Sequence, residues 1–128
     1  MITVALIMGC KDNEVKNTDQ LRVQVIHADK AMSDLAVTIG FNNSILTYAD
    51  SNIVKLDDGK LPIIGKTAFA ASFNQDNDAK TLSWYPVNAD VAESGELGYS
   101  WGNWKFIAKD TVYYGNYSCK IKMYKMDL

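Results

Sequence analysis

The sequence predicts a single α+β domain in which helices come first and antiparallel strands follow. Apolar residues recur at spacings of three and four between residues 21 and 39, which is the pattern of one face of a helix. Three long strand-like segments rich in aromatic residues follow, at residues 81–92, 96–109 and 111–126. Turn-forming residues separate them, so we expect an antiparallel meander. This order is typical of α+β rather than βαβ proteins.

Composition limits the kinds of partner that the protein can have. The chain has 128 residues, 48% of them hydrophobic, which suits one domain with a substantial core. A formal net charge of −2 argues against a nucleic-acid partner. With only His27, Cys10 and Cys119 as soft ligands, the sequence offers no metal-site or CxxC pattern. We expect no metal and no cofactor, and a disulfide between the two cysteines stays open.

The first twenty residues differ from the rest of the chain. Residues 1–10 carry no charge and end in Cys10, and a polar stretch follows. The run Ile7-Met8-Gly9-Cys10 resembles the lipobox of bacterial lipoproteins. This resemblance implies a signal segment and tether over residues 1–20, a lipid on Cys10, and an anchored protein of the bacterial cell envelope. The alternative is an apolar N-terminal strand or buried arm in a cytoplasmic protein, with Cys10 an ordinary small hydrophobe.

The domain itself is expected to span residues 21–128 and to begin with a long helix. Thr18 or Asp19 is suited to the N-cap, and Gly40 is placed to end the helix in a left-handed conformation. The apolar stripe predicted to face the core consists of Val25, Ala28, Met32, Leu35 and Ile39.

Shorter elements are expected between this helix and the meander. Asp50-Ser51-Asn52 should end a second helix, and Gly59 lies where a turn needs a positive φ. The expected elements are a helix over 43–49, short strands over 53–56 and 61–64, a helix over 66–73, and a polar loop over 74–80.

Several short motifs resemble the NTF2-like superfamily, and within it the DUF4440 and SnoaL-like branch. In the first half they are Ala28-Asp29-Lys30-Ala31-Met32, Gly40, Tyr48-Ala49-Asp50, Asp58-Gly59 and Ile64-Gly65-Lys66. In the second half they are Leu82-Ser83-Trp84-Tyr85-Pro86, Ser94-Gly95-Glu96-Leu97-Gly98-Tyr99 and Gly115-Asn116-Tyr117.

The resemblance implies a cystatin-like α+β cone. Three N-terminal helices pack on a strongly curved antiparallel sheet, and a cavity opens at one end. Members of the superfamily commonly form homodimers through the sheet. They include ketosteroid isomerases, cyclases, dehydratases and binding domains without known chemistry, so the fold does not determine the activity.

Aromatic residues are the main candidates for lining such a cavity. Tyr99 and Trp101 share one face of a predicted strand, and Tyr113 and Tyr117 share one face of the next. Flat apolar walls with a few hydroxyls suit a small, partly hydrophobic ligand. The alternative is that the rings fill the cone or a dimer interface. The candidate ligand-binding residues are Tyr48, Trp84, Tyr99, Trp101, Tyr117 and Asp29.

Asp29 is the acid of most interest, because it lies one position beyond the apolar stripe. Facing a cavity, it is a candidate proton acceptor. Otherwise it bonds backbone or a neighbouring basic group and holds the helix against a strand. Asp50 is expected to serve a turn, and His27 to lie on a helix flank. We assign no catalytic residue.

Three functions therefore remain open. The first is binding of a small ligand in the cone, the second is cofactor-independent acid–base catalysis of the ketosteroid isomerase, cyclase or dehydratase kind, and the third is a dimeric interaction module with a filled cavity. A desolvated acid within hydrogen-bonding reach of a tyrosine and facing empty volume favours catalysis. A cavity plugged by Trp84, Tyr99 and Phe106 favours the interaction module.

Overall fold

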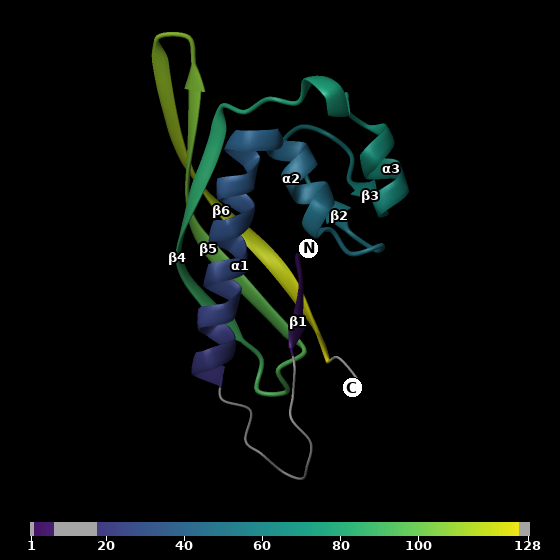
Figure 1. The fold of residues 1–128 in the computed structure, drawn as a ribbon, viewed down its shortest axis with the longest axis vertical. Helices are drawn as coiled ribbons and strands as arrows, with labels where there is room; N and C mark the ends of the chain where they lie inside the picture. The colour runs from purple at the N-terminus through teal and green to yellow at the C-terminus, as the bar shows by residue number, and fades with distance from the viewer. Residues whose placement is uncertain (1, 7–17, 126–128) are drawn as a thin grey trace.

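The computed structural model describes residues 2–6 and 18–125, and the α+β class is confirmed. A helical N-terminal part packs on an antiparallel sheet (Figure 1). The elements are β1 (Ile2–Leu6), α1 (Thr18–Ile39), α2 (Phe41–Tyr48), β2 (Val54–Lys55), β3 (Ile63–Ile64), α3 (Lys66–Ala71), the 3-10 turn η1 (Gln75–Asn77), β4 (Leu82–Val91), β5 (Leu97–Ala108) and β6 (Thr111–Lys125).

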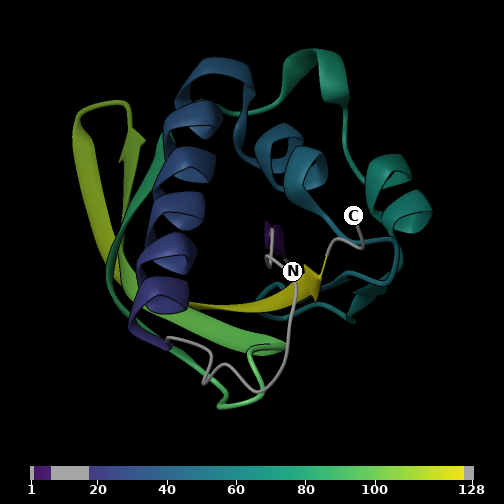
Figure 2. The same cartoon turned by 60° about the horizontal axis from the view of Figure 1, so that its bottom comes forward.

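The main sheet has the strand order β1-β6-β5-β4. Strands β4, β5 and β6 form the expected antiparallel meander, and Trp104 of β5 pairs with Trp84 of β4 and with Gly115 of β6. The pairing of β4 with β5 shifts register between Pro86 and Asn88, and such bulges increase local twist. Figure 2 shows the sheet bending around α1, while β2 and β3 form a separate small hairpin.

Helix α1 lies on the sheet with its most buried face rotated from the predicted stripe. Val25 and Met32 are buried as expected, but Ala28, Leu35 and Ile39 are only partly buried. Two polar residues, Asp29 and Ser33, occupy the centre of the buried face because both find hydrogen-bond partners on β4. The main core consists of Leu21, Val25, Met32, Ala36, Trp84, Ala89, Val91 and Ile121.

Gly40 separates α1 from α2, as the sequence predicts, but in a different conformation. Its φ of 108° and ψ of 154° are positive and extended rather than left-handed helical. A side chain at this position would collide with Asp78. Asp78 approaches closely because it caps α2, where it accepts hydrogen bonds from the Asn43 backbone N–H at 2.7 Å and from Asn42 Nδ2 at 3.0 Å.

The hairpin and α3 pack around a second, smaller core of Ala49, Ile53 and Phe69. Asp50 is buried beside it and accepts a hydrogen bond from the Asn52 backbone N–H at 3.2 Å, in keeping with the predicted turn role.

The N-terminal residues Ile2–Leu6 form β1, which pairs in parallel with residues 121–125 of β6. A strand is the alternative that the sequence left open for this segment. Cys10 and the polar stretch after it lie outside the described residues, so its lipidation stays a prediction. Within the described part of the chain, no helix has the length and apolar character needed to cross a membrane.

Candidate functional site

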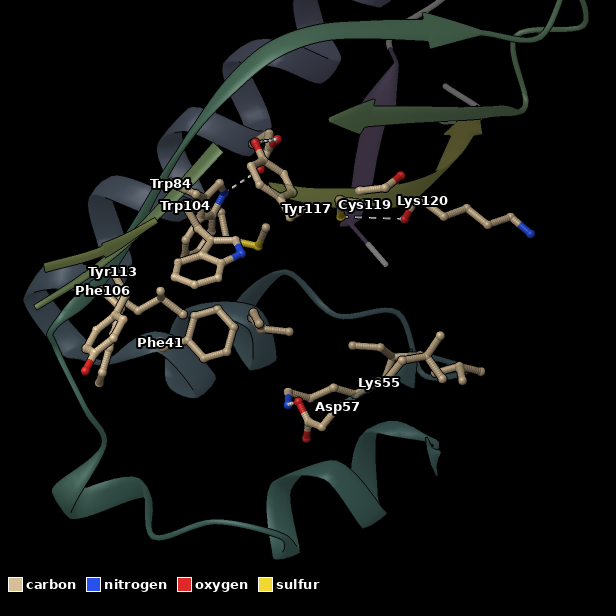
Figure 3. A pocket seen from close by; sticks show the side chains of 18 residues that line it. Phe41, Lys55, Asp57, Trp84, Trp104, Phe106, Tyr113, Tyr117, Cys119 and Lys120 are labelled. Carbon is tan, nitrogen blue, oxygen red and sulfur yellow. Dashed lines mark hydrogen bonds and ion pairs between the residues drawn. The ribbon is translucent and has the colours of Figure 1, made fainter. Parts of the chain in front are cut away.

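A cavity of about 1000 Å³ lies between the concave face of the sheet, α1, α2 and the β2 segment (Figure 3). Most of its lining is apolar, and six aromatic side chains contribute to it. Volumes of roughly 300–1,000 Å³ are typical of small-molecule sites. The lining residues are Asp29, Met32, Phe41, Ile45, Ile53, Val54, Lys55, Leu56, Asp57, Leu82, Trp84, Trp104, Phe106, Tyr113, Tyr117, Ser118, Cys119 and Lys120.

The most unusual lining residue is Asp29, whose carboxylate is fully buried. One oxygen, Oδ1, accepts a hydrogen bond from the Trp84 indole Nε1–H at 2.6 Å. The other, Oδ2, accepts one from the Tyr117 hydroxyl at 2.6 Å. The carboxylate thus joins α1 to two strands of the sheet. Among the ion pairs of the described residues, none involves Asp29.

Trp84 is held to α1 at two points, which fixes the position of this wall. Its backbone N–H donates to Ser33 Oγ at 2.8 Å, one helical turn from the Asp29 contact. Its ring meets the edge of Phe41 with centroids 5.6 Å apart, and lies 6.4 Å from the ring of Tyr117. Edge-to-face pairs have a preferred geometry, so they fix the orientation of a ring, which the burial of apolar area alone does not do.

Trp104 forms the neighbouring wall and depends on a glycine. Its cross-strand partner Gly115 has no side chain, and a Cβ there would overlap the indole ring. The indole Nε1–H donates to the Asn116 backbone oxygen at 3.1 Å. The ring therefore lies flat over β6 at the edge of the cavity.

The wall opposite Tyr117 carries an ion pair (Figure 3). Lys55 Nζ forms an ion pair with Asp57, and the Lys55 side chain is only 11% exposed. The ammonium lies 5.8 Å from the ring centroid of Phe41 and 5.7 Å from that of Phe69, within the range of cation–π contact.

Two groups near Asp29 are held in their neutral forms. Burial, the hydrogen bond to Asp29 and its negative charge together raise the pKa of the Tyr117 phenol far above its usual range. Burial, with the charge of Asp29, raises the pKa of the Cys119 thiol to about 11. Cys119 is a free thiol. At neutral pH neither group supplies a second negative charge.

The structure brings together three of the six residues proposed from sequence. Asp29, Trp84 and Tyr117 all line the cavity. Asp29 holds the helix against the sheet, but through the Trp84 and Tyr117 side chains, and not through backbone or a basic group.

The other three aromatic candidates lie elsewhere, which corrects the expectation that they line the cavity. Tyr99 and Trp101 are 47% and 42% exposed on the convex face of the sheet. The face of β5 that meets α1 carries Gly98, Ser100 and the even-numbered positions after them. Tyr48, the last residue of α2, is partly buried and packs against the main core, and it does not line the cavity.

Sequence reasoning missed several lining residues, notably Phe41, Lys55 and Trp104. For Trp104 a signal existed, because it shares strand parity with Gly98 and Ser100. Small residues at these positions permit close packing of a helix, and so indicate which face of β5 points inward. No comparable signal marks Phe41 or Lys55, because their places in the cavity wall depend on where the tertiary fold puts α2 and β2.

The remaining candidates do not form a second site in the described structure. His27 is exposed on α1, as expected. Among the described residues, no cluster of three or more histidine, cysteine, aspartate or glutamate side chains could hold a metal ion. No known protein family, curated protein or solved structure matches this chain.

Proposed function

We propose that this chain is an NTF2-like domain that binds a small, partly hydrophobic ligand in its cavity. The observation that carries the proposal is the cavity of about 1000 Å³, walled by aromatic rings and containing one buried carboxylate–phenol pair. A concave apolar space with a few fixed polar groups is the usual form of a ligand site. Trp84 and Phe106 line the space without filling it, and Tyr99 lies on the other face of the sheet.

The NTF2-like assignment is supported by the order and packing of the elements. Helices and a short hairpin precede a three-stranded meander, and α1 lies against the concave side of that meander (Figure 2). The sequence resemblance implies this order, and it implies a cavity bounded by the first helix and the sheet.

The binding proposal is tested with 2-naphthalenemethanol as the probe, since it combines a flat apolar body with one hydroxyl. We expect saturable binding by calorimetry, and ¹H–¹⁵N NMR shifts confined to cavity residues, including the Trp104 indole N–H. Trp101, on the convex face, supplies an internal control whose indole signal should not move. Absence of binding, or shifts confined to the convex face, would contradict the proposal.

Acid–base catalysis is the second candidate, because Asp29 is desolvated, lies 2.6 Å from a tyrosine oxygen and lines empty volume. Both carboxylate oxygens already accept hydrogen bonds, one from the Trp84 indole N–H and one from the Tyr117 hydroxyl, so binding is the better supported function. The test is exchange of the α-protons of 2-tetralone for deuterium in D₂O. Exchange that the wild-type protein accelerates and Asp29→Asn does not would establish the enzyme.

The convex face supports a homodimer through the sheet. Tyr85, Tyr99, Trp101 and Tyr114 are between 42% and 72% exposed there. Aromatic residues are enriched at the centres of interfaces. Sedimentation equilibrium of the wild-type protein should give a dimer, and Trp101→Glu should shift it toward monomer. A wild-type monomer at all concentrations would exclude this interface.

The predicted lipid anchor at Cys10 is incompatible with strand β1 in the mature protein. Processing before Cys10 removes Ile2–Leu6, so that the lipidated form cannot contain β1. Expression in a bacterium, membrane fractionation and the mass of the mature N-terminus distinguish the two forms. Lipidation predicts a membrane-bound chain that begins at Cys10 and is released by Cys10→Ser. A soluble chain that retains residues 2–6 would contradict it.

A further inference from the structure

We infer that the ligand is a small organic cation, an amine carried on an apolar or aromatic body. This rests on the proposed cavity-binding function and names the chemical class of its ligand. The ammonium group is recognised at the Asp29–Tyr117 end of the cavity, and the apolar body lies among the aromatic walls.

The first argument is the balance of charge around the cavity. Four described lining residues carry charge, namely Asp29, Lys55, Asp57 and Lys120. Lys55 is paired with Asp57, so these two charges largely cancel. Lys120 is exposed, pairs across the sheet with the convex residue Tyr99, and extends away from the rings in Figure 3. Asp29 is therefore the one buried charge of the lining that forms no ion pair among the described residues.

A buried charge has more influence than an exposed one, because water does not screen it. Asp29 has no exposed surface, and Met32, Trp84 and Trp104 line the same cavity with apolar, low-dielectric surface. Low-dielectric walls focus the field of such a charge into the empty volume beside it. The field therefore favours a cation in the cavity and disfavours an anion.

The second argument is the polarity of the hydrogen bonds. The Tyr117 hydroxyl donates its hydrogen bond to Asp29, so its oxygen can only accept a hydrogen bond from a ligand. The Trp84 indole N–H likewise donates to Asp29 and is not available to a ligand. This end of the cavity thus presents an acceptor backed by a negative charge, which matches the N–H donors of an ammonium group.

The third argument is the nature of the walls. The ring of Trp84 lies 6.4 Å from that of Tyr117, Trp104 lines the same cavity, and the faces of such rings attract cations. A cationic side chain of this protein already uses the same chemistry on the opposite wall, where the Lys55 ammonium lies over Phe41. An aromatic enclosure with a carboxylate behind it is complementary to an amine and not to a carboxylate or phosphate.

The test compares three naphthalene probes of nearly equal size at pH 7. They are 2-naphthylmethylammonium, 2-naphthalenemethanol and 2-naphthoate, which differ in charge at one position. Calorimetry should show the cation binding about tenfold more tightly than the alcohol, and the alcohol about tenfold more tightly than the carboxylate. Equal affinities, or tightest binding of the carboxylate, would overturn the inference and leave cavity binding intact. Failure of all three probes to bind would refute the proposed function itself.

Variants at Asp29 and Tyr117 test whether these residues cause the preference for the cationic probe. Asp29→Asn removes the charge at nearly constant size, so the preference for the cation over the alcohol should fall to about twofold or less. Asp34→Asn is the matched control, since it removes an equal charge from the exposed side of α1 and should leave the preference unchanged. Tyr117→Phe removes the acceptor oxygen at a partly buried position, and should lower the preference even if Asp29→Asn does not fold. A full preference retained in folded Asp29→Asn and Tyr117→Phe would place recognition elsewhere.

Discussion

The two faces of the β4–β5–β6 sheet carry similar aromatic residues in different surroundings. On the concave face, Trp84 and Tyr117 bind a buried carboxylate, and both border empty volume together with Trp104. On the convex face, Tyr99 and Trp101 stand among polar neighbours and are roughly half exposed. The residue types are alike, and the side of the sheet determines whether a ring forms a pocket wall or a surface.

This difference shows that one polar residue on α1 organises the concave face. Asp29 orients Trp84 by its indole N–H and Tyr117 by its hydroxyl, so the rings have fixed positions. Among the hydrogen bonds of the described residues, none gives Tyr99 or Trp101 a comparable side-chain partner. Changes at Asp29 should therefore have larger effects than any change on the convex face.

The largest expected effect is that of Asp29→Ala on stability. The substitution leaves the buried indole N–H of Trp84 unsatisfied and opens space between α1 and the sheet. We expect the free energy of unfolding to fall by about 3 kcal/mol. Urea denaturation measures it, with Asp34→Ala on the exposed side of α1 as the control. A loss no larger than that of the control would show that the concave face is not organised by Asp29.

Gly115→Ala should have the next largest effect. Its added methyl group overlaps the ring of Trp104, which must move toward the cavity. We expect a loss of about 2 kcal/mol in the free energy of unfolding and weaker binding of 2-naphthalenemethanol. Tyr114→Phe, which removes an exposed hydroxyl from the convex face of the same strand, is the control and should change neither quantity measurably.

A matched pair of tryptophan variants compares the two faces directly. Trp104→Ala removes a cavity wall and should weaken 2-naphthalenemethanol binding by about tenfold. Trp101→Ala removes a ring of the same kind from the convex face and should leave the affinity within about twofold. Calorimetry on both variants gives the comparison, and equal losses would contradict the assignment of the site to the concave face.

The smallest expected effect is chemical and concerns Cys119 at the cavity. Its pKa of about 11 means that little reactive thiolate exists at pH 8. The folded state holds the Cys119 proton more tightly than the unfolded state. The contribution of this group to the free energy of unfolding is therefore complete at neutral pH and is lost as the pH rises toward 11. Alkylation by iodoacetamide, followed on the Cys119 peptide by mass spectrometry, should keep accelerating up to about pH 11. Urea-unfolded protein is the control, and its rate should level off near pH 9.

Much of the secondary structure could be predicted from local patterns. The helix over 21–39 and the three strand segments agree with α1, β4, β5 and β6 to within a few residues, because periodicity and turn residues are local signals. The 3-10 turn η1 lies where the sequence predicts only a polar loop over 74–80. The Asn74 side chain caps this turn by accepting a hydrogen bond from the Asp76 backbone N–H. The lipid anchor, the dimer and the ligand stay predictions.

The sequence by itself determined the order of the elements and the α+β class, and it singled out Asp29 as a candidate because this acid lies beside an apolar stripe. Gly98 and Ser100 favour one side of β5 as the inward face, but only the tertiary structure decided that α1 packs on that side, and hence that Trp104 lines the cavity while Trp101 does not. It also joined Asp29 to Trp84 and Tyr117, which are 55 and 88 residues away in the chain. Strand periodicity separates two faces without telling which is buried, because burial depends on the element that packs against them.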